Sequence, residues 1–224
     1  MKTLWLSEAK LIRPTGLAAV LCFNNWLLGL LLNNNLLIKG GSVSELSVRD
    51  QPYHYVFQSL DIASGILFTI VALLVKRQVK KTSLGLNVLI WGTIVFGISN
   101  VIDGLLTLPC AETLEKCYIP IHINWSHFNF PSHGYSSVII ATLYFVLPLA
   151  GIFYARYINH RLLYFGSLFT VIVASLSLVS AVWQYLDLHS FTVNASGWAQ
   201  GIQMLVMGSW FILWLQTMKL RLDS

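Results

Sequence analysis

Six continuous apolar stretches constrain the fold of this chain more than any other feature of its sequence. They cover about 14–33, 55–75, 84–107, 135–155, 162–184 and 199–218. Each is close to the roughly 20 residues that an α-helix needs to cross a hydrocarbon core about 30 Å thick. Barrel strands would instead alternate apolar and polar residues over about ten positions. The sequence therefore predicts an all-α, polytopic bundle of six transmembrane helices, with residues 1–224 forming a single integral membrane domain.

The composition indicates the same class of protein. Hydrophobic residues make up 56% of the chain and charged residues only 10%, whereas roughly 25% of the residues in soluble domains are charged. The formal net charge is +5, and a basic chain can indicate nucleic-acid binding. Here the positive charges lie in short loops between apolar stretches. We therefore predict membrane lipids as partners and no nucleic acid.

The distribution of Lys and Arg predicts the orientation, because cytoplasmic loops of membrane proteins carry an excess of these residues. With the N-terminus inside, eleven of the 14 Lys and Arg residues lie on the cytoplasmic side. These are Lys2, Lys10, Arg13, Lys76, Arg77, Lys80, Lys81, Arg156, Arg161, Lys219 and Arg221. We predict that both termini are cytoplasmic, that the protein lies in the inner (cytoplasmic) cell membrane, and that its long loops are outside.

The second outer loop, about 108–134, contains two of the three cysteines. Cys110 and Cys117 are seven positions apart, and thiols this close on the oxidising side of a membrane commonly pair. The loop therefore predicts a disulfide. A metal site is the poorer alternative for these two residues, because no second cysteine pair accompanies them. Cys22, inside the first span, is predicted to be a packing residue.

Asp61 and Asp103 are the first candidate functional residues within the spans. Asp61 lies about six residues, or roughly 9 Å, below the predicted outer end of the second span, and Asp103 lies at a similar depth in the third. A carboxylate in hydrocarbon is costly and normally faces the bundle interior with a partner. Two close carboxylates also tend to share a proton or a cation. Their matched depth predicts a shared site; the alternative is that each caps a helix end or reaches the interface.

Other polar side chains fall at a comparable depth. They are Asn100, Gln200, Gln203, His133, Ser136 and Ser137, with His127 just upstream of the fourth span. We predict that they line a polar pocket open to the outer side, with Asn100, Gln200 and Gln203 as candidate ligand-binding residues. The alternative is that these groups hold helices together by hydrogen bonds. Interhelical hydrogen bonding is also our prediction for Asn24 and Asn25 in the first span.

Several short motifs together resemble one family. They are Ser44-Glu45-Leu46-Ser47, Gln51-Pro52, Asp61 with Gly65, Asp103, the Cys110 to Cys117 loop, the segment from His127 to His133 with Ser137, and the start of the sixth span from Gly197 to Gln200. In this combination, which covers most of the chain, the sequence resembles the bacterial and archaeal membrane proteins grouped as domain of unknown function nine-nine-eight. The resemblance implies a membrane location but no established activity. We count Glu45, in the first of these motifs, among the candidate ligand-binding residues.

A more distant similarity is to the CREST superfamily of membrane hydrolases, which includes the alkaline ceramidases. Those proteins bind zinc through an Asp and several His among their helices, with a Ser nearby. The similarity implies a zinc cofactor held by Asp103, His127 and His133, with Ser137 close to it. The last span of this chain contains no histidine, whereas the superfamily has a His-x-x-x-His pair there.

Two functions from different classes remain open, with transport as a third. The first is a binding module, in which the pocket takes a lipid or small amphiphile, or the protein serves as a subunit for a membrane-protein partner or a second copy of itself. The second is a membrane-embedded hydrolase that acts on a lipid at the outer leaflet. A metal would then lower the pKa of a bound water, or two carboxylates would act as acid and base. The candidate catalytic residues are Asp61, Asp103, His133 and Ser137.

Overall fold

The computed structural model is almost entirely α-helical. It describes residues 2–79, 81–108, 110–111, 113, 123–124, 127–128, 132–186 and 196–222, and the side chains of 10–79, 81–108, 110–111, 113, 133–182 and 197–218.

Five helices are long and apolar enough to cross a membrane. They are α4 (His54–Gln78), α5 (Leu84–Leu105), α6 (Ser132–Tyr157), α7 (Arg161–Leu186) and α8 (Ser196–Leu222). A sixth span results if α1 (Lys2–Phe23) and α2 (Trp26–Leu32) are counted together, because the pair passes the same test but is bent by 46°. The prediction of an all-α, multi-pass membrane protein is confirmed, and the number of spans is five or six within the described part of the chain.

The first span differs from the continuous helix predicted over 14–33. It breaks at Asn24 and Asn25, where the Asn25 amide bonds to Cys22 O and the Leu27 amide bonds to Asn24 O, three residues back instead of four. Asparagine competes with the helix for backbone hydrogen bonds, and here the Asn25 side chain bonds to α4 instead, as described below. The bend follows from that tertiary contact.

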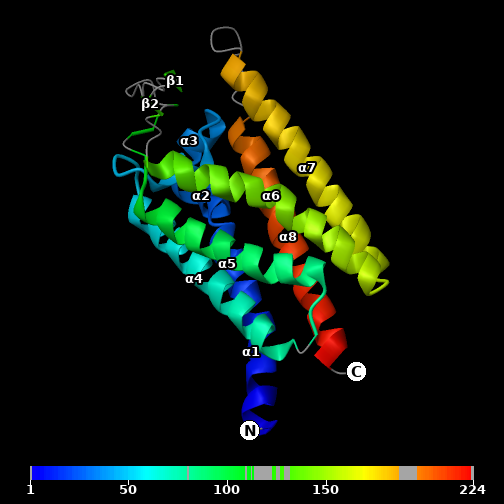
Figure 1. Cartoon of the computed structure of the whole chain (residues 1–224). Coiled ribbons are helices and arrows are strands. Elements are labelled where there is room, and N and C mark those ends of the chain that lie inside the picture. Colours follow the sequence, from blue (N-terminus) through cyan, green and yellow to red (C-terminus); the bar gives the residue numbers. More distant parts are fainter. Residues whose placement is uncertain are drawn as a thin grey trace.

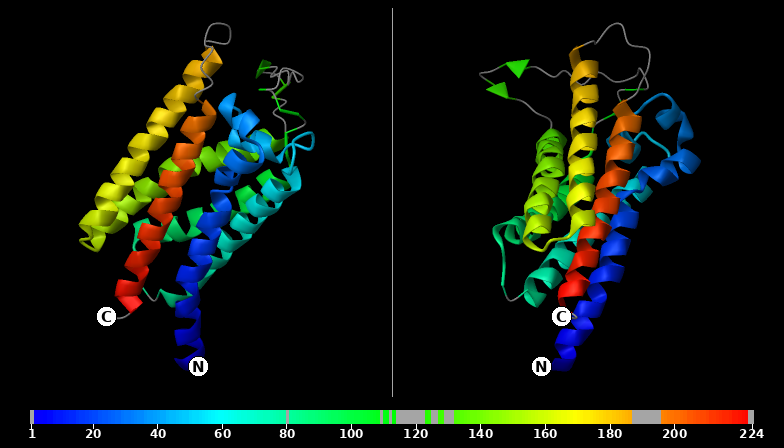
Figure 2. Two further views of the ribbon diagram at one scale, coloured as in Figure 1. Left: turned by 180° about the vertical axis from the view of Figure 1, so that it is seen from behind. Right: turned by 90° about the vertical axis from the view of Figure 1, so that its right-hand side faces the viewer.

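The start of α1 and the end of α8 lie at the same end of the bundle (Figures 1 and 2). The other end carries α2, α3 (Asn34–Ile38), the 3₁₀ helix η1 (Val43–Ser47) and the paired two-residue strands β1 (Ile123–Asn124) and β2 (His127–Phe128). An even number of passes would bring both termini to one side. The cytoplasmic location of that side remains a prediction.

Close packing is concentrated between α4 and α5. A Cβ added at Gly65 would lie 2.7 Å from the Val101 amide nitrogen, and one added at Gly97 would lie 2.9 Å from that of Thr69. Only glycine permits such an approach, and small residues are the usual means by which helices pack closely in membranes. Beside this contact, one phenylalanine from each of α1, α4, α5 and α8 forms an aromatic cluster. Its members are Phe23, Phe68, Phe96 and Phe211.

The segment containing η1 lies against the start of α8 and is fixed there by two contacts. The backbone amide of Val43 donates to Gln200 Oε1 of α8 at 2.9 Å. A Cβ at Gly197 would lie 2.8 Å from Gly40 O, so the start of α8 packs directly on the turn before η1. This turn also contains Gly40 at φ 81°, a left-handed conformation that glycine adopts at no steric cost. The fold thus brings residues 40–47 next to α4 and to the start of α8.

Candidate functional site

A cavity of about 370 Å³ lies beside η1, between the helices of the bundle. Its polar lining comes from five helices and the segment at η1, and consists of Ser42, Ser44, Asp61, Asn100, Asp103, Ser137, Tyr144, Ser177, Gln200 and Gln203. Its apolar lining consists of Phe23, Val43, Ile140, Ala141, Phe145, Ala174, Leu178, Ala181 and Met204. Six residues singled out from the sequence therefore share one cavity: Asp61, Asn100, Asp103, Ser137, Gln200 and Gln203.

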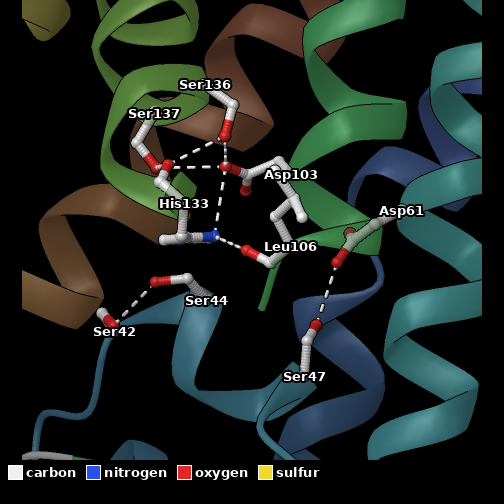
Figure 3. Close-up of polar contacts among 9 residues, drawn as sticks. All are labelled: Ser42, Ser44, Ser47, Asp61, Asp103, Leu106, His133, Ser136 and Ser137. Carbon is white, nitrogen blue, oxygen red and sulfur yellow. Dashed lines mark hydrogen bonds and ion pairs between the residues drawn. The ribbon is translucent and has the colours of Figure 1, made fainter. Parts of the chain in front are cut away.

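Asp61 lies on α4 and is held by two donors from the N-terminal part of the chain. Asn25 Nδ2 donates to Asp61 Oδ1 at 2.6 Å. Ser47 Oγ donates to Asp61 Oδ2 at 3.0 Å, as Figure 3 shows. The carboxylate thereby joins the break in the first span to η1. Since a buried carboxylate needs hydrogen-bond donors, Asp61 accounts for the positions of both partners.

Asp103 lies on α5 and faces the first turn of α6. Its Oδ1 accepts from Ser136 Oγ at 2.6 Å and from Ser137 Oγ at 3.1 Å, and His133 Nδ1 lies 3.3 Å from it (Figure 3). His133 Nδ1 also lies 2.9 Å from the carbonyl oxygen of Leu106. Both neighbours of this nitrogen are acceptors, so Nδ1 carries the hydrogen.

The Asp103 cluster contains the residue types of a Ser–His–Asp hydrolase in a different arrangement. In such a triad the serine hydroxyl donates to a histidine nitrogen, and the carboxylate orients the ring from the other side. Here Ser136 Oγ and Ser137 Oγ each lie within hydrogen-bond distance of Asp103 Oδ1 and of His133 O, so each hydroxyl hydrogen is directed to one of these acceptors or shared between them. No serine hydroxyl in the described part of the chain bonds to the His133 ring. The geometry therefore provides a buried hydrogen-bond network and no activated serine.

The predicted zinc ligands are only partly described. Asp103 and His133 are adjacent, while His127 lies in β2 with its side chain outside the described residues. Among the described side chains, no three His, Cys, Asp or Glu residues cluster closely enough to hold a metal ion. The zinc site stays a prediction from resemblance. A tetrahedral site would need ligands beyond the Asp103–His133 pair.

The three predicted amide ligands have different contacts. Asn100 is only 7% exposed, and its Nδ2 donates to Phe96 O at 2.7 Å. Gln200 uses Oε1 to accept from Val43, which leaves its Nε2 on the cavity wall. Gln203 also lines the cavity.

Glu45 lies outside the described cavity lining. The residue is 6% exposed. Its carboxylate accepts from the Ser42 amide at 3.1 Å, the Thr113 amide at 3.1 Å and Thr113 Oγ1 at 2.9 Å. These bonds tie η1 to the loop after α5. A ligand-binding role for Glu45 stays a prediction. Its contacts hold two segments of the chain together.

Sequence reasoning missed several residues of the site. Ser42, Ser44, Tyr144 and Ser177 line the cavity, and Ser47 bonds to Asp61. Interhelical bonding by Asn25 was expected and is observed, whereas Asn24 Nδ2 donates to Val20 O within its own helix. A usable signal existed: Asn25 and Asp61 lie at similar depths in adjacent spans, and each needs a polar partner.

The predicted disulfide falls partly outside the described residues. Cys110 is described but Cys117 is not, so the pairing stays a prediction. Cys22 has a free thiol and lies in α1, as expected for a packing residue.

Comparison with known proteins gives a family but no characterised relative. The model of a family described as "Protein of unknown function (DUF998)" matches residues 16–217. No curated protein and no solved structure matches the chain.

Proposed function

The chain belongs to the DUF998 family of proteins of unknown function, and on that premise we propose that its cavity binds a lipid or small amphiphile. The cavity would open to the extracytoplasmic side of the inner membrane, and no reaction would be needed for this role. The observation that carries the proposal is the mixed character of the cavity lining, in which two carboxylates and three amides occur together with aliphatic and aromatic side chains.

The size and lining of the cavity support a ligand that is part polar and part apolar. At about 370 Å³ it falls within the roughly 300–1,000 Å³ of typical small-molecule sites. Such sites are mostly apolar, with a few placed polar groups that fix the orientation of the ligand. Ile140, Phe145 and Leu178 offer a hydrocarbon chain the same surroundings that the bilayer does. The head group alone would then decide selectivity.

The predicted orientation supports access from outside. The cavity lies beside η1, at the end of the bundle opposite the start of α1 and the end of α8. At the other end, Lys76 and Arg77 occupy the last turn of α4, and Lys76 Nζ lies 3.9 Å from the ring centre of Trp91. Basic residues at that end indicate the cytoplasmic side.

Sidedness is tested by cysteine labelling in a variant whose native cysteines are replaced by serine. A membrane-impermeant maleimide should label Arg49→Cys in intact cells but label Arg161→Cys only after lysis. Labelling of Arg161→Cys alone in intact cells would place the cavity on the cytoplasmic side and remove this part of the proposal.

Binding is tested by the lipid that the purified protein retains. Ser177 lines the cavity and Ser175, two residues away on α7, is exposed elsewhere. We expect native mass spectrometry to show a bound lipid or amphiphile on the wild type and on Ser175→Phe, and none on Ser177→Phe. Equal retention by Ser177→Phe, or no retention by folded wild type together with no thermal stabilisation by any added amphiphile, would contradict the proposal.

A lipid hydrolase is the alternative proposal, favoured by one observation: Asp103 and Ser137 line the cavity, and His133 contacts Asp103. Zinc bound to purified protein at a stoichiometric level, together with release of a fatty acid or head group that a chelator stops, would favour the hydrolase. If the purified protein contains no metal and hydrolyses none of a panel of labelled lipids, the hydrolase proposal is excluded and the binding proposal stands.

A further inference from the structure

The polar part of the cavity contains acceptors that lack donors. Asn100 is more than nine-tenths buried, and because its Nδ2 bonds to Phe96 O, its Oδ1 is fixed as an acceptor; Oδ1 receives no hydrogen bond from a described residue. Asp103 Oδ2 likewise receives none, since all three donors around Asp103 approach Oδ1. Asn100 and Asp103 both line the cavity, and neither oxygen is among the fully enclosed polar atoms without a partner in the described part of the chain. A ligand in the cavity that donates hydrogen bonds would therefore find two acceptors here.

Positive charge is scarce around these acceptors. The described cavity lining contains two carboxylates and no Lys, Arg or His. His133 contacts Asp103 but does not belong to the described cavity lining. In the described part of the chain it is the one basic side chain in contact with either acid. Charged groups in an apolar bundle normally pair with an opposite charge. A cationic head group would complete such a pair from within the cavity.

The chemistry of the acceptors also selects between kinds of cation. Quaternary ammonium groups, which have no N–H, are usually held by aromatic cages. Here three aromatic rings, those of Phe23, Tyr144 and Phe145, line the cavity, and the acceptors left without a donor are oxygens of Asn100 and Asp103. Carboxylate and amide oxygens recognise N–H donors directly. The lining therefore fits a primary ammonium better than a trimethylammonium.

We propose that the cavity selects amphiphiles with a primary ammonium head group, with the nitrogen placed between Asp61, Asn100 and Asp103 and the hydrocarbon along α6 and α7. This inference rests on the proposed function and specifies its ligand. The same head-group chemistry occurs in aminophospholipids and in free long-chain amines, and the experiments below distinguish these two sources.

The main test compares head groups on one hydrocarbon chain. Wild-type protein in a neutral maltoside detergent is titrated with dodecylammonium, dodecyltrimethylammonium, dodecanol and dodecanoate, and binding is followed by thermal stabilisation. We expect dodecylammonium to bind at least about tenfold more tightly than the other three, because it alone supplies both charge and N–H donors. If dodecanol or dodecanoate binds equally well, the head-group inference is wrong while the proposed function survives. If none of the four binds, the test overturns both.

Variants of the two cavity carboxylates then test which residues select the ammonium head group. Asp103→Asn and Asp61→Asn should each lose about tenfold in affinity for dodecylammonium and little for dodecanol. Asp50→Asn, the same change on an exposed acid outside the cavity, should change neither. Unchanged amine binding by both cavity variants would contradict the placement of the nitrogen, and the wild-type comparison holds even if one variant fails to fold.

The source of the ligand is decided in nanodiscs that contain phosphatidylethanolamine, phosphatidylcholine and phosphatidylglycerol in equal parts. Enrichment of phosphatidylethanolamine on the protein, measured by native mass spectrometry, would identify an aminophospholipid. Selective binding of dodecylammonium without such enrichment would identify a free amine. Enrichment of phosphatidylglycerol over both other lipids would overturn the inference.

Discussion

Two regions of the bundle use small side chains to opposite effect. In the packed region, defined by Gly65, Gly97 and the four-phenylalanine cluster, small residues let α4 and α5 approach closely and aromatic rings fill the remaining volume. In the open region, defined by the cavity lining of α6 and α7, small residues leave space instead. They are Ser137, Ala141, Ala174, Ser177 and Ala181. A small side chain therefore does not by itself indicate close packing: the approach of the neighbouring backbone decides whether it closes a contact or creates a cavity.

The largest effect is expected in the packed region. Gly65→Ala and Gly97→Ala each place a Cβ against backbone atoms of the facing helix, which cannot move without separating α4 from α5. We expect a loss of at least about 3 kcal/mol in unfolding free energy, beyond the usual range for overpacking, or no folded protein. Thermal unfolding in maltoside detergent with a size-exclusion profile measures this.

Gly166→Ala is the matched control for the glycine variants. A Cβ there would meet only Leu213 Cδ2, the end of a flexible side chain. Since alanine favours a helix over glycine by about 1 kcal/mol, this variant should be as stable as wild type or slightly more stable. Equal stability of Gly97→Ala and Gly166→Ala would mean that the packed region is not limited by backbone contact.

The second effect concerns Glu45, which links η1 to the loop after α5. Glu45→Ala leaves the amides of Ser42 and Thr113 without their acceptor. Hydrogen bonds to charged groups contribute about 1.5–3 kcal/mol, so we expect a loss of about 2 kcal/mol. Hydrogen–deuterium exchange should rise at residues 42–47 and stay unchanged at the packed region. A uniform rise in exchange along the chain would instead indicate that the Glu45 hydrogen bonds stabilise the whole fold.

The sequence predicts the composition of the site better than its connections. The membrane class and the approximate spans follow from apolar length, and the matched depth of Asp61 and Asp103 anticipates that both line one cavity. The break at Asn24 and Asn25 was not predictable from the first span alone, because its cause is a carboxylate on another helix.

The placement of η1 shows the same limit. Its bond from Val43 to Gln200 joins residues 157 positions apart, and no local pattern encodes such a contact. A sequence allows the inference that polar side chains within a span face the bundle interior, because exposing them to hydrocarbon costs free energy. The identity of each partner depends on how the helices are arranged, which a single sequence leaves open.

A third, smaller loss of stability is expected for Asn25→Ala and not for the same change at the adjacent Asn24. Asn25→Ala removes the donor to Asp61 Oδ1 at 2.6 Å and should cost about 1–2 kcal/mol, within the range for an unsatisfied buried partner. Asn24→Ala removes a bond to Val20 O of its own helix, and the buried Asn24 Oδ1 accepts no hydrogen bond from any described residue. We expect Asn24→Ala to be close to neutral in thermal unfolding. An equal loss in both variants would mean that the bond from Asn25 to Asp61 contributes no more to stability than the local bond of Asn24 does.

The smallest effect on stability should come from filling the open region. Ser177→Phe adds a ring where the cavity has room, so the unliganded protein should change by less than about 0.5 kcal/mol, as at an ordinary surface position. Ala72→Phe adds the same ring bulk at a fully buried position of α4 in the core, where overpacking typically costs about 1–3 kcal/mol. Both variants are measured by thermal unfolding in lipid-free detergent. If Ser177→Phe lowers the stability of the protein as much as Ala72→Phe does, the space beside α7 is required for folding. A near-neutral Ser177→Phe that no longer retains a ligand would mean that the small residues of α6 and α7 maintain the cavity for binding.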